Sequence, residues 1–314
     1  MSEGAKGIVA ITGITGFIGR TVARHLQVSG WQVRGLVRSA AGSAGLPAAG
    51  LQLIPGSLEN FTSLLALVDG VDAVVHCAGA VRGASFADFA EVNLTGLENL
   101  LQILKISSRK VKLIHLSSLA ARHPELSFYA ESKKKGEELL AGNFNDGSWT
   151  ILRPPAVYGP GDREMLPVFK LMARGLAPIP GRGRSRFSLL HVEDLAVAVE
   201  KLLEAVPEQQ IFELHDGKTS GYDWSEIIEL AADLRGKPVR RLYIPLALLT
   251  PAAWLNQKLG SFTRFRPMLT PGKIREIAYP DWVCDNEKIS RVTGWQPAVT
   301  LTAGLTDLLN WTKK

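Results

Sequence analysis

A glycine-rich segment near the start of the chain constrains the fold more than any other feature. Gly13, Gly16 and Gly19 stand between an apolar run at residues 7–11 and a helical apolar pattern at residues 20–26. Strand, glycine-rich turn and helix in this order are typical of a dinucleotide-binding loop, whose helix N-terminus attracts the phosphates. An ordinary strand–helix turn with the same glycines is the alternative, so this interpretation depends on the rest of the chain.

The composition sets broad limits on the kind of protein. With 314 residues, 46% of them hydrophobic, the chain is large enough for one large domain or two smaller ones. Two cysteines, Cys77 and Cys284, suggest no disulfide framework and fit a reducing cytoplasm. The longest apolar stretch, residues 244–255, is short of the roughly 20 residues that a membrane span needs. We therefore expect a cytoplasmic protein without a membrane span.

Apolar runs typical of strands alternate with helical patterns along the first half of the chain. The predicted strands are residues 7–11, 31–38, 51–58, 71–79, 111–118 and a run from residue 149. This alternation predicts a doubly wound parallel sheet, an α/β fold of the Rossmann type. We expect the dinucleotide-binding domain at 1–160, with 186–215 returning to it. Residues 161–185 and 216–314 then form a smaller α/β substrate lobe.

The end of the second predicted strand bears on the choice of cofactor. A carboxylate at this point holds the ribose 2′-hydroxyl of NAD, but here Arg38 and Ser39 follow the strand. Because an arginine accommodates the 2′-phosphate, Arg38 favours NADP over NAD. The alternative is a surface arginine that merely follows the strand, which would leave NAD as the cofactor.

A second pattern carries acid–base chemistry. The fifth predicted strand ends at Ser118, and Tyr129 and Lys133 follow at helical i,i+4 spacing, which places both on one face. An ammonium close to a phenol stabilises the phenolate, so we expect Lys133 to lower the pKa of Tyr129. Tyr129 is then a candidate general acid or base at an alcohol or ketone carbon.

Three motifs together resemble the extended short-chain dehydrogenases/reductases, the NAD(P)-dependent epimerase/dehydratase family. They are the glycine spacing at 13–19, the Tyr129–Lys133 pair, and the Leu-Arg-Pro-Pro-Ala-Val-Tyr-Gly-Pro-Gly segment at 152–161. The resemblance extends over essentially the whole chain. It implies that Tyr129 exchanges a proton with the substrate oxygen and that Ser118 hydrogen-bonds that oxygen. It also implies that Lys133 binds the nicotinamide ribose.

The resemblance further implies a set of cofactor contacts along the carboxyl ends of the strands. They are Gly13, Gly16, Phe17, Ile18, Gly19, Arg38, Ser57, Leu58, Cys77, Ala78, Gly79, Lys133, Pro154 and Val157. Many relatives carry an aspartate where Ser57 stands, and Pro154 and Val157 correspond to the nicotinamide segment. We interpret His76 as a strand-end histidine and Asn93 as a structural tie. The scattered histidines and cysteines predict no metal site.

The substrate lobe leaves two alternatives open. Nucleotide-sugar relatives hold a diphosphate with an arginine where this chain has Phe187, although arginines stand nearby at 182, 184 and 186. The apolar residues 243–268 resemble instead the substrate lobe of steroid-, flavonoid- or hopanoid-associated relatives. An apolar stripe of this kind is more often part of a core than the wall of a pocket.

The sequence therefore predicts an NADP(H)-dependent oxidoreductase or epimerase/dehydratase that transfers hydride at an alcohol or ketone carbon of a small molecule, with Tyr129 as acid or base. The alternatives are a nucleotide-sugar epimerase or dehydratase with tightly bound NAD, and a non-catalytic dinucleotide-binding subunit. Nucleic acid is not expected as a partner, because no aromatic residues interleave the basic loop. In this fold two helices often build a dimer interface, and residues 97–106 with 135–140 are the candidates for a homodimer.

Overall fold

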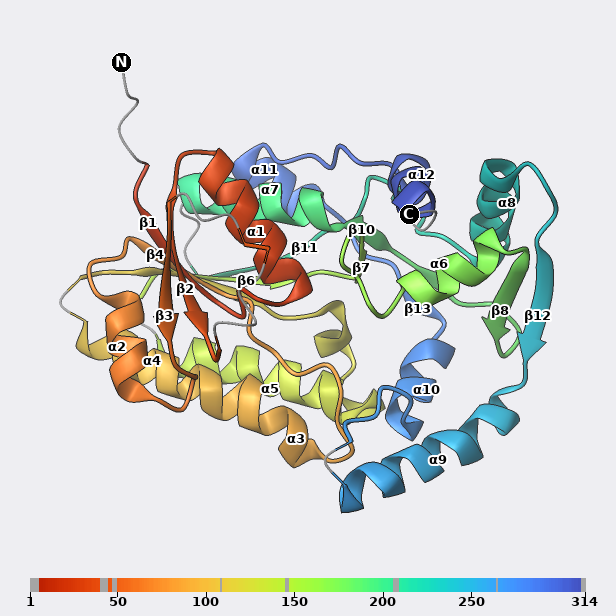
Figure 1. Ribbon diagram of the computed structural model, residues 1–314, viewed down its shortest axis with the longest axis horizontal. Coiled ribbons are helices and arrows are strands. Elements are labelled where there is room, and N and C mark those ends of the chain that lie inside the picture. Colours follow the sequence, from red (N-terminus) through yellow and green to blue (C-terminus); the bar gives the residue numbers. More distant parts are fainter. Residues whose placement is uncertain are drawn as a thin grey trace.

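A seven-stranded parallel sheet is the centre of the structure, a computed structural model that describes residues 6–39, 45–46, 50–107, 109–144, 147–205, 209–263 and 265–311. The strand order is β11-β6-β5-β4-β1-β2-β3 (Figure 1). The strands are β1 (Ile8–Thr12), β2 (Gln32–Val37), β3 (Leu51–Pro55), β4 (Ala73–His76), β5 (Lys112–Leu116), β6 (Trp149–Arg153) and β11 (Gln210–Glu213). Most are mainly apolar because both sheet faces are covered. The predicted doubly wound fold is confirmed.

The order of the strands reverses next to β1. From β1 the chain winds outward through β2 and β3, and it then returns to β4 and continues through β5 and β6. At this reversal Thr12 lies opposite His76 in the register of β1 and β4. The loops that leave the carboxyl ends of such strands run apart, which leaves room for a ligand. Most of the predicted cofactor residues follow these carboxyl ends.

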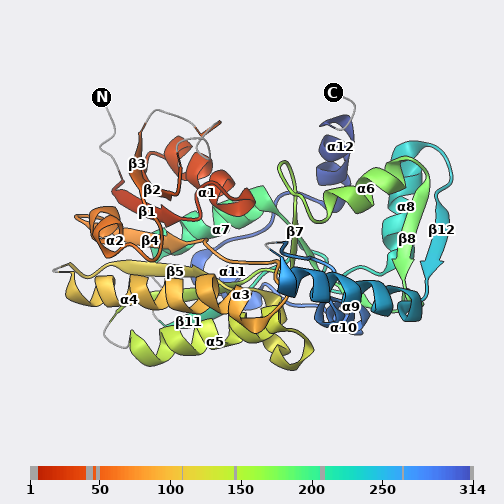
Figure 2. The same cartoon turned by 60° about the horizontal axis from the view of Figure 1, so that its bottom comes forward.

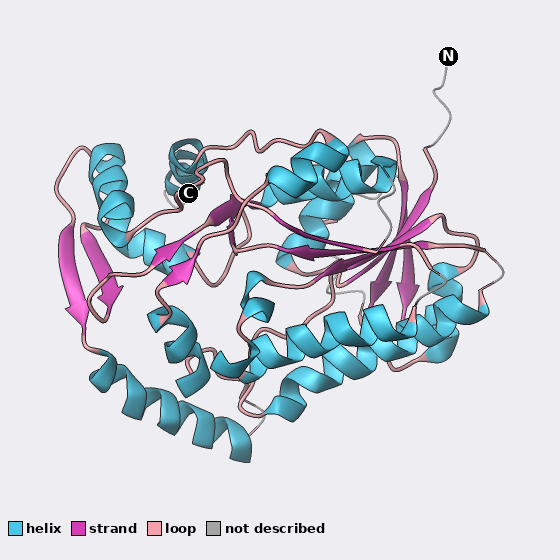
Figure 3. Ribbon diagram, turned by 180° about the vertical axis from the view of Figure 1, so that it is seen from behind, coloured by secondary structure: helices cyan, strands magenta, loops and turns pink. Residues whose placement is uncertain are grey.

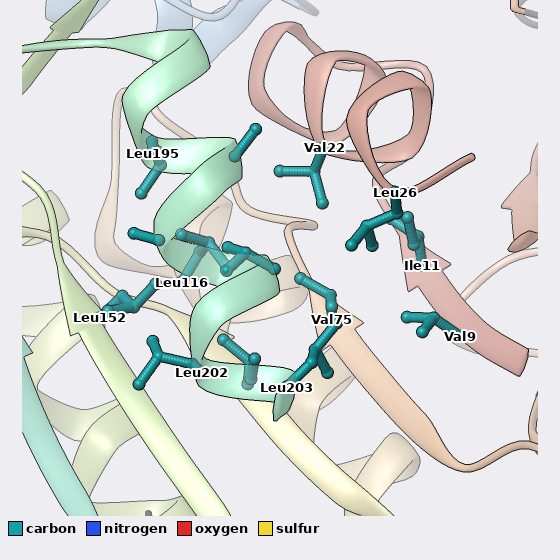
Figure 4. Close-up of a cluster of buried hydrophobic side chains, with 14 of the residues drawn as sticks. Val9, Ile11, Val22, Leu26, Val75, Leu116, Leu152, Leu195, Leu202 and Leu203 are labelled. Carbon is teal, nitrogen blue, oxygen red and sulfur yellow. The ribbon is translucent and has the colours of Figure 1, made fainter. Parts of the chain in front are cut away.

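Helices cover both faces of the sheet. On one face lie α1 (Phe17–Val28), α7 (Val192–Ala205) and α11 (Glu287–Thr293), and on the other α2 (Phe61–Val68), α4 (Gly96–Ile106) and α5 (Phe128–Asn143) (Figures 1 and 3). Figure 4 shows the first interface, where Val22 and Leu26 of α1 and Leu195 of α7 belong to one apolar cluster with Ile11 and Val75 of the strands. Each face thus has its own apolar core, so the sheet is held from both sides.

A smaller lobe stands beside the carboxyl edge of the sheet. Its own apolar cluster joins α6 (Leu166–Ala173), α8 (Trp224–Arg235) and α12 (Leu301–Trp311). Three two-stranded pieces complete it: β8 (Leu176–Pro180) with β12 (Arg240–Ile244), β7 (Ala156–Tyr158) with β10 (Leu189–His191), and β9 (Arg186–Phe187) with β13 (Asp281–Trp282). Two further helices, α9 (Leu246–Phe262) and α10 (Pro271–Ala278), lie on its lower side in Figure 1.

Two local features differ from the sequence-based expectation. β8 was not predicted, because Pro178 and Pro180 argue against a strand interior; both are tolerated in a two-stranded ribbon. The helical pattern of residues 91–101 begins as a π-helical turn, Glu91–Thr95, and continues as α4. The predicted domain boundaries at residues 160, 185 and 215 stay predictions.

The helix α4 bears on the predicted homodimer. Its residues Leu97, Leu100 and Leu101 are buried within the chain itself, while Ile106 at its end is exposed. The homodimer therefore stays a prediction.

None of the helices in the described residues combines the length and the apolar character that crossing a bilayer demands.

Candidate active site

The glycine-rich turn leaves no room for side chains at two of its three glycines. Gly13 has a φ of 68°, and a Cβ atom there would lie 2.6 Å from the backbone nitrogen of Ala78. A Cβ atom at Gly19 would lie 2.3 Å from the carbonyl oxygen of Gly13. Gly16 begins α1 without a side-chain cap, and the first turn of the helix carries no acidic residue. The helix N-terminus is therefore suited to an anion such as a pyrophosphate. Phe17 and Ile18 are half-buried beside it.

The next two strands end in a group of exposed or half-exposed residues. Arg38 is exposed directly after β2, and Ser57, after β3, donates a hydrogen bond to Glu59 over 3.3 Å. Leu58 packs against Gly96, where a Cβ atom would lie 2.7 Å from Cδ1 of Leu58. The carbonyl of Leu58 accepts a hydrogen bond from the side chain of Asn99. Arg38 and Ser57 thus occupy the sheet edge predicted for the adenosine ribose, and Leu58 anchors the loop behind them.

The segment after β4 approaches the predicted catalytic lysine. A Cβ atom on Gly79 would lie 3.1 Å from Nζ of Lys133, and the amide of Ala78 donates to Oγ1 of Thr12 over 3.3 Å. Burial raises the pKa of the Cys77 thiol to about 12, so Cys77 is not a thiolate at neutral pH.

Two histidines and an asparagine near this segment have structural partners. His76 Nδ1 lies 2.8 Å from Oγ1 of Thr12, and burial lowers the pKa of His76 to about 3. Its ring stacks on that of His115, with centroids 5.4 Å apart. Asn93 accepts a hydrogen bond from the amide of Ala80 over 2.8 Å and donates to Ser132 over 2.9 Å. Asn93 therefore ties the loop after β4 to α5, as predicted.

Ser118, Tyr129 and Lys133 come from the end of β5 and the first two turns of α5. Ser118 caps a short 3₁₀ turn, Leu119–Arg122, and its side chain hydrogen-bonds to that of Tyr129. The ammonium of the buried Lys133 donates to the carbonyl of Leu116 over 2.9 Å. Burial lowers the pKa of Lys133 to about 8, against the opposing effect of Glu137. Ser118 and Tyr129 thus interact directly, and Lys133 is held on the end of β5, at the same carboxyl edge of the sheet.

The pKa of Tyr129 is raised, so the expectation that Lys133 lowers it is wrong for this structure. Burial, which penalises the phenolate, is the largest cause. The Ser118 hydrogen bond and the charge of Lys273 lower the pKa of Tyr129, and Glu276 raises it. The sequence pattern gave the spacing of Tyr129 and Lys133, but not the burial of the phenol. It also gave no sign that Lys273 is the cation that lowers the pKa of Tyr129.

Lys273 and Glu276, which sequence reasoning missed, reach the site from α10. Nζ of Lys273 lies 2.8 Å from Oε2 of Glu276, and Glu276 also accepts a hydrogen bond from the hydroxyl of Ser127. Ser127 in turn caps α5 by accepting the amide of Ala130 over 3.0 Å. The N-terminus of the helix that carries Tyr129 is therefore clamped to the substrate lobe. The i,i+3 spacing of the Lys–Glu pair was the sole signal in the sequence.

A buried ion pair fixes α5 to the sheet. Arg153, at the end of β6, donates to Glu137 of α5 over 2.8 Å and 2.5 Å, and Ser117 donates to the same carboxylate over 2.6 Å. Next to it, the carbonyl of Pro154 accepts the amide of Leu119 over 2.9 Å, and Val157 pairs with Leu190 between β7 and β10. The two predicted nicotinamide residues thus follow β6, on the same edge as Ser118.

The fold and this site define a nicotinamide-dinucleotide oxidoreductase of the short-chain dehydrogenase/reductase type. Three features carry the assignment: the switch point of the sheet, a glycine turn without room for side chains, and the Ser–Tyr–Lys set. Within the described ranges, no group of three or more His, Cys, Asp or Glu side chains could hold a metal ion.

Comparison with known proteins agrees with this class. Residues 9–214 match the model of the "NAD dependent epimerase/dehydratase family". The chain is 33% identical over 312 residues to a ceramide reductase of Caulobacter vibrioides, covering 99% of this chain and 96% of that protein. It is 25% identical over 326 residues to a 2-alkyl-3-oxoalkanoate reductase of Stenotrophomonas maltophilia, covering 95% and 97%. The chain therefore belongs to the NAD dependent epimerase/dehydratase family.

A solved structure supports the fold. The UDP-glucuronic acid 4-epimerase of Bacillus cereus, in complex with UDP-glucuronic acid and NAD, superposes with a TM-score of 0.77. The match has 21% identity and covers 98% of this chain and 99% of that one. At this identity the likeness concerns the arrangement of the elements and not the substrate.

Proposed function

We propose that the protein is an NADPH-dependent reductase that converts a ketone on a lipid substrate into the alcohol. The observation that carries this proposal is the phenol of Tyr129, which is hydrogen-bonded to Ser118 and whose pKa burial raises above its ordinary value. A neutral phenol at neutral pH is a proton donor, as the reduction of a ketone requires. When bound, the reduced dinucleotide supplies the hydride.

Each of the three side chains has a distinct role in this proposal. Tyr129 gives its hydroxyl proton to the ketone oxygen, and Ser118 donates a hydrogen bond to the same oxygen. Lys133, whose ammonium is fixed on the carbonyl of Leu116 beside Gly79, holds the nicotinamide ribose. The turn at Gly13, Gly16 and Gly19 holds the pyrophosphate, because the N-terminus of α1 that follows it has no side-chain cap and Gly13 and Gly19 leave no side chain in the way.

The contacts of the basic loop favour a lipid over a nucleotide sugar. Arg186, the arginine nearest to the expected diphosphate position, donates to the carbonyls of Ser220 and Gly221 and lies 3.4 Å from Asp223. The expected position itself is Phe187, whose ring lies 5.5 Å from that of Trp224. These groups are engaged in holding the lobe together. Two relatives agree with this preference, because one is named for a ceramide and the other for an alkyl-substituted oxoalkanoate.

The test is the stoichiometry of cofactor consumption. We expect the purified protein to oxidise one NADPH for each alcohol formed from β-keto lipids such as long-chain β-keto amides. Redox-neutral conversion of a UDP-sugar, with no net consumption of NADPH, would instead identify an epimerase or dehydratase. Binding of the dinucleotide without turnover of any substrate would favour the non-catalytic subunit.

The choice of NADPH has a separate test at Arg38. We expect Arg38→Ala to reduce the preference for NADPH over NADH about tenfold, which corresponds to about 1.4 kcal/mol. Arg109→Ala is the matched control, because Arg109 pairs with Asp72 at the opposite end of the strands. An unchanged preference in Arg38→Ala would show that this arginine does not contact the 2′-phosphate.

A further inference from the structure

One face of α9 is fixed to the body of the protein. Ala253 is fully buried, and the side-chain amide of Gln257 donates to the carbonyl of Ala84 over 2.8 Å. A Cβ atom on Gly260 would lie 2.9 Å from Cβ of Ala84 and 2.8 Å from Cδ of Pro267. Ala253, Gln257 and Gly260 recur at helical spacing, so they define the inner side of the helix.

The opposite face of α9 is apolar and exposed. Leu248, Leu255, Leu259 and Phe262 follow one another at intervals of seven, four and three residues, which places them on one side of the helix. Their exposed fractions range from 50% to 84%. Pro251 and Ala252 in the same sector are exposed as well. A soluble helix normally turns this kind of face toward the core, so an outward apolar face indicates a partner.

The border of this face has the chemistry of a lipid headgroup region. Trp254 is exposed at the edge of the apolar sector, and Nζ of Lys258 lies 5.4 Å from the centre of its ring. The helix contains no acidic residue in its 17 residues, and Arg240 and Arg241 precede it. The whole chain carries a net charge of +6. Amphipathic tryptophan and lysine side chains beside an apolar face are suited to anionic lipid headgroups.

The position and size of the face favour a membrane surface over a second copy of the chain. Figures 1 and 2 show α9 along the outside of the molecule, with the substrate lobe behind it. From Leu248 to Phe262 the helix rises about 20 Å, and a strip about 10 Å wide covers roughly 200 Å². A stable dimer buries about 800 Å² on each partner. A lipid surface sets no such minimum, because each apolar side chain is buried in it separately.

We propose that α9 lies in the plane of an anionic membrane surface, with Leu248, Leu255, Leu259 and Phe262 inserted among the lipids. The inner side of the same helix contacts Ala84, in the loop that follows β4, and α10 carries Lys273 toward Tyr129. The helix thus stands between the lipid surface and the catalytic tyrosine. A membrane lipid could then enter the active site along this helix, and this step rests on the proposed function. The docking of α9 on the membrane does not rest on it.

Vesicle flotation without substrate or cofactor tests the docking. We expect the protein to float with vesicles of phosphatidylcholine and phosphatidylglycerol, less with phosphatidylcholine alone, and less at high salt. The triple variant Leu255→Gln/Leu259→Gln/Phe262→Gln should bind at least about tenfold more weakly, because three inserted side chains are lost. The matched control Val28→Gln/Leu65→Gln changes apolar side chains that are exposed on other helices and should bind normally.

Two outcomes would overturn the proposal. One is no binding of the native chain to either vesicle. The other is equal binding by the triple variant, with its circular dichroism and melting temperature unchanged. A dimer in light scattering that the triple variant abolishes, without vesicle binding, would assign the face to a second copy.

As an independent readout, brominated lipids should quench the fluorescence of the native chain more than that of Trp254→Phe. Docking on vesicles without ketone reduction would refute only the proposed function, and the membrane proposal would stand.

Discussion

Two helices of almost equal length, α5 and α9, use their side chains in opposite ways. α5 has 16 residues and buries polar side chains, among them Ser132, Lys133 and Glu137. α9 has 17 residues, all of them described by the structure; it buries only Ala253 and exposes leucines and a phenylalanine. Burying charges and exposing apolar groups both cost free energy relative to the ordinary pattern. The comparison teaches that each deviation needs a reason outside the helix, and we propose a ligand for α5 and a membrane surface for α9.

The largest effect should follow a change in α5, the helix with buried polar side chains, at Tyr129. We expect Tyr129→Phe to lower kcat by a factor of about 10² to 10⁴, because the proton donor is lost while the fold of α5 is kept. Binding of the dinucleotide, measured by fluorescence titration, should change little. The control is Tyr243→Phe, an exposed tyrosine in β12. A variant with full activity would show that another group protonates the substrate.

The next effect tests whether the substrate lobe supports α5. Glu276 is buried between the hydroxyl of Ser127 and the ammonium of Lys273. We expect Glu276→Gln to lower the free energy of unfolding by about 2–3 kcal/mol, because it breaks this pair and leaves a cation without its partner. Denaturant unfolding measures the change.

The exposed pair of Glu287 and Arg291 provides the control for that loss. Both side chains are largely in solvent, so Glu287→Gln should change the free energy of unfolding by less than about 0.5 kcal/mol. Equal losses in the two variants would mean that the clamp from α10 contributes nothing to the stability of α5.

The sequence predicted α5 better than α9. The reason is how far apart in the sequence the residues that determine each feature lie. Gly13, Ser118, Tyr129 and Lys133 stand in short patterns, a strand followed by a turn or a pair one helical turn apart. Such patterns are read without knowledge of the tertiary structure. The comparisons and the sheet topology confirm the fold that they predicted. The roles of the site residues stay predictions until activity is measured.

The features that the sequence did not reveal depend on contacts between distant segments. Ser127 and Glu276 are 149 residues apart, and no local pattern connects them. The raised pKa of Tyr129 arises from burial by several elements, which the spacing of Tyr129 and Lys133 does not show. The apolar residues 243–268 include α9, and an apolar stripe of this kind favoured a core position. The structure places that apolar face outside, since the lobe has no element to cover it among the described residues.

A third prediction concerns the cost of burying Lys133 in α5. Its pKa falls from the usual 10.5 to about 8, so between these pH values the unfolded chain binds more protons than the folded one. Stability should therefore rise with pH over this window, by up to about 3 kcal/mol for this group at about 1.4 kcal/mol per pKa unit. The difference in unfolding free energy between the native chain and Lys133→Met should show this rise. A difference that stays constant from pH 8 to 10.5 would mean that Lys133 is not desolvated.

The smallest effect tests the cation that α10 supplies to the site. Lys273 lowers the pKa of Tyr129, so its removal should raise that pKa, and an unpaired Glu276 acts in the same direction. The proposed function makes Tyr129 the base in the alcohol-oxidising direction. The rise of kcat/KM with pH should then move to higher pH in Lys273→Met, by one pH unit or less. Lys135→Met, which removes an exposed lysine paired with Glu131 on the outer side of α5, should leave the profile in place. A profile that moves to lower pH would show that Lys273 does not act on the phenol. The polar chemistry of α5 would then be independent of the lobe to which α9 belongs.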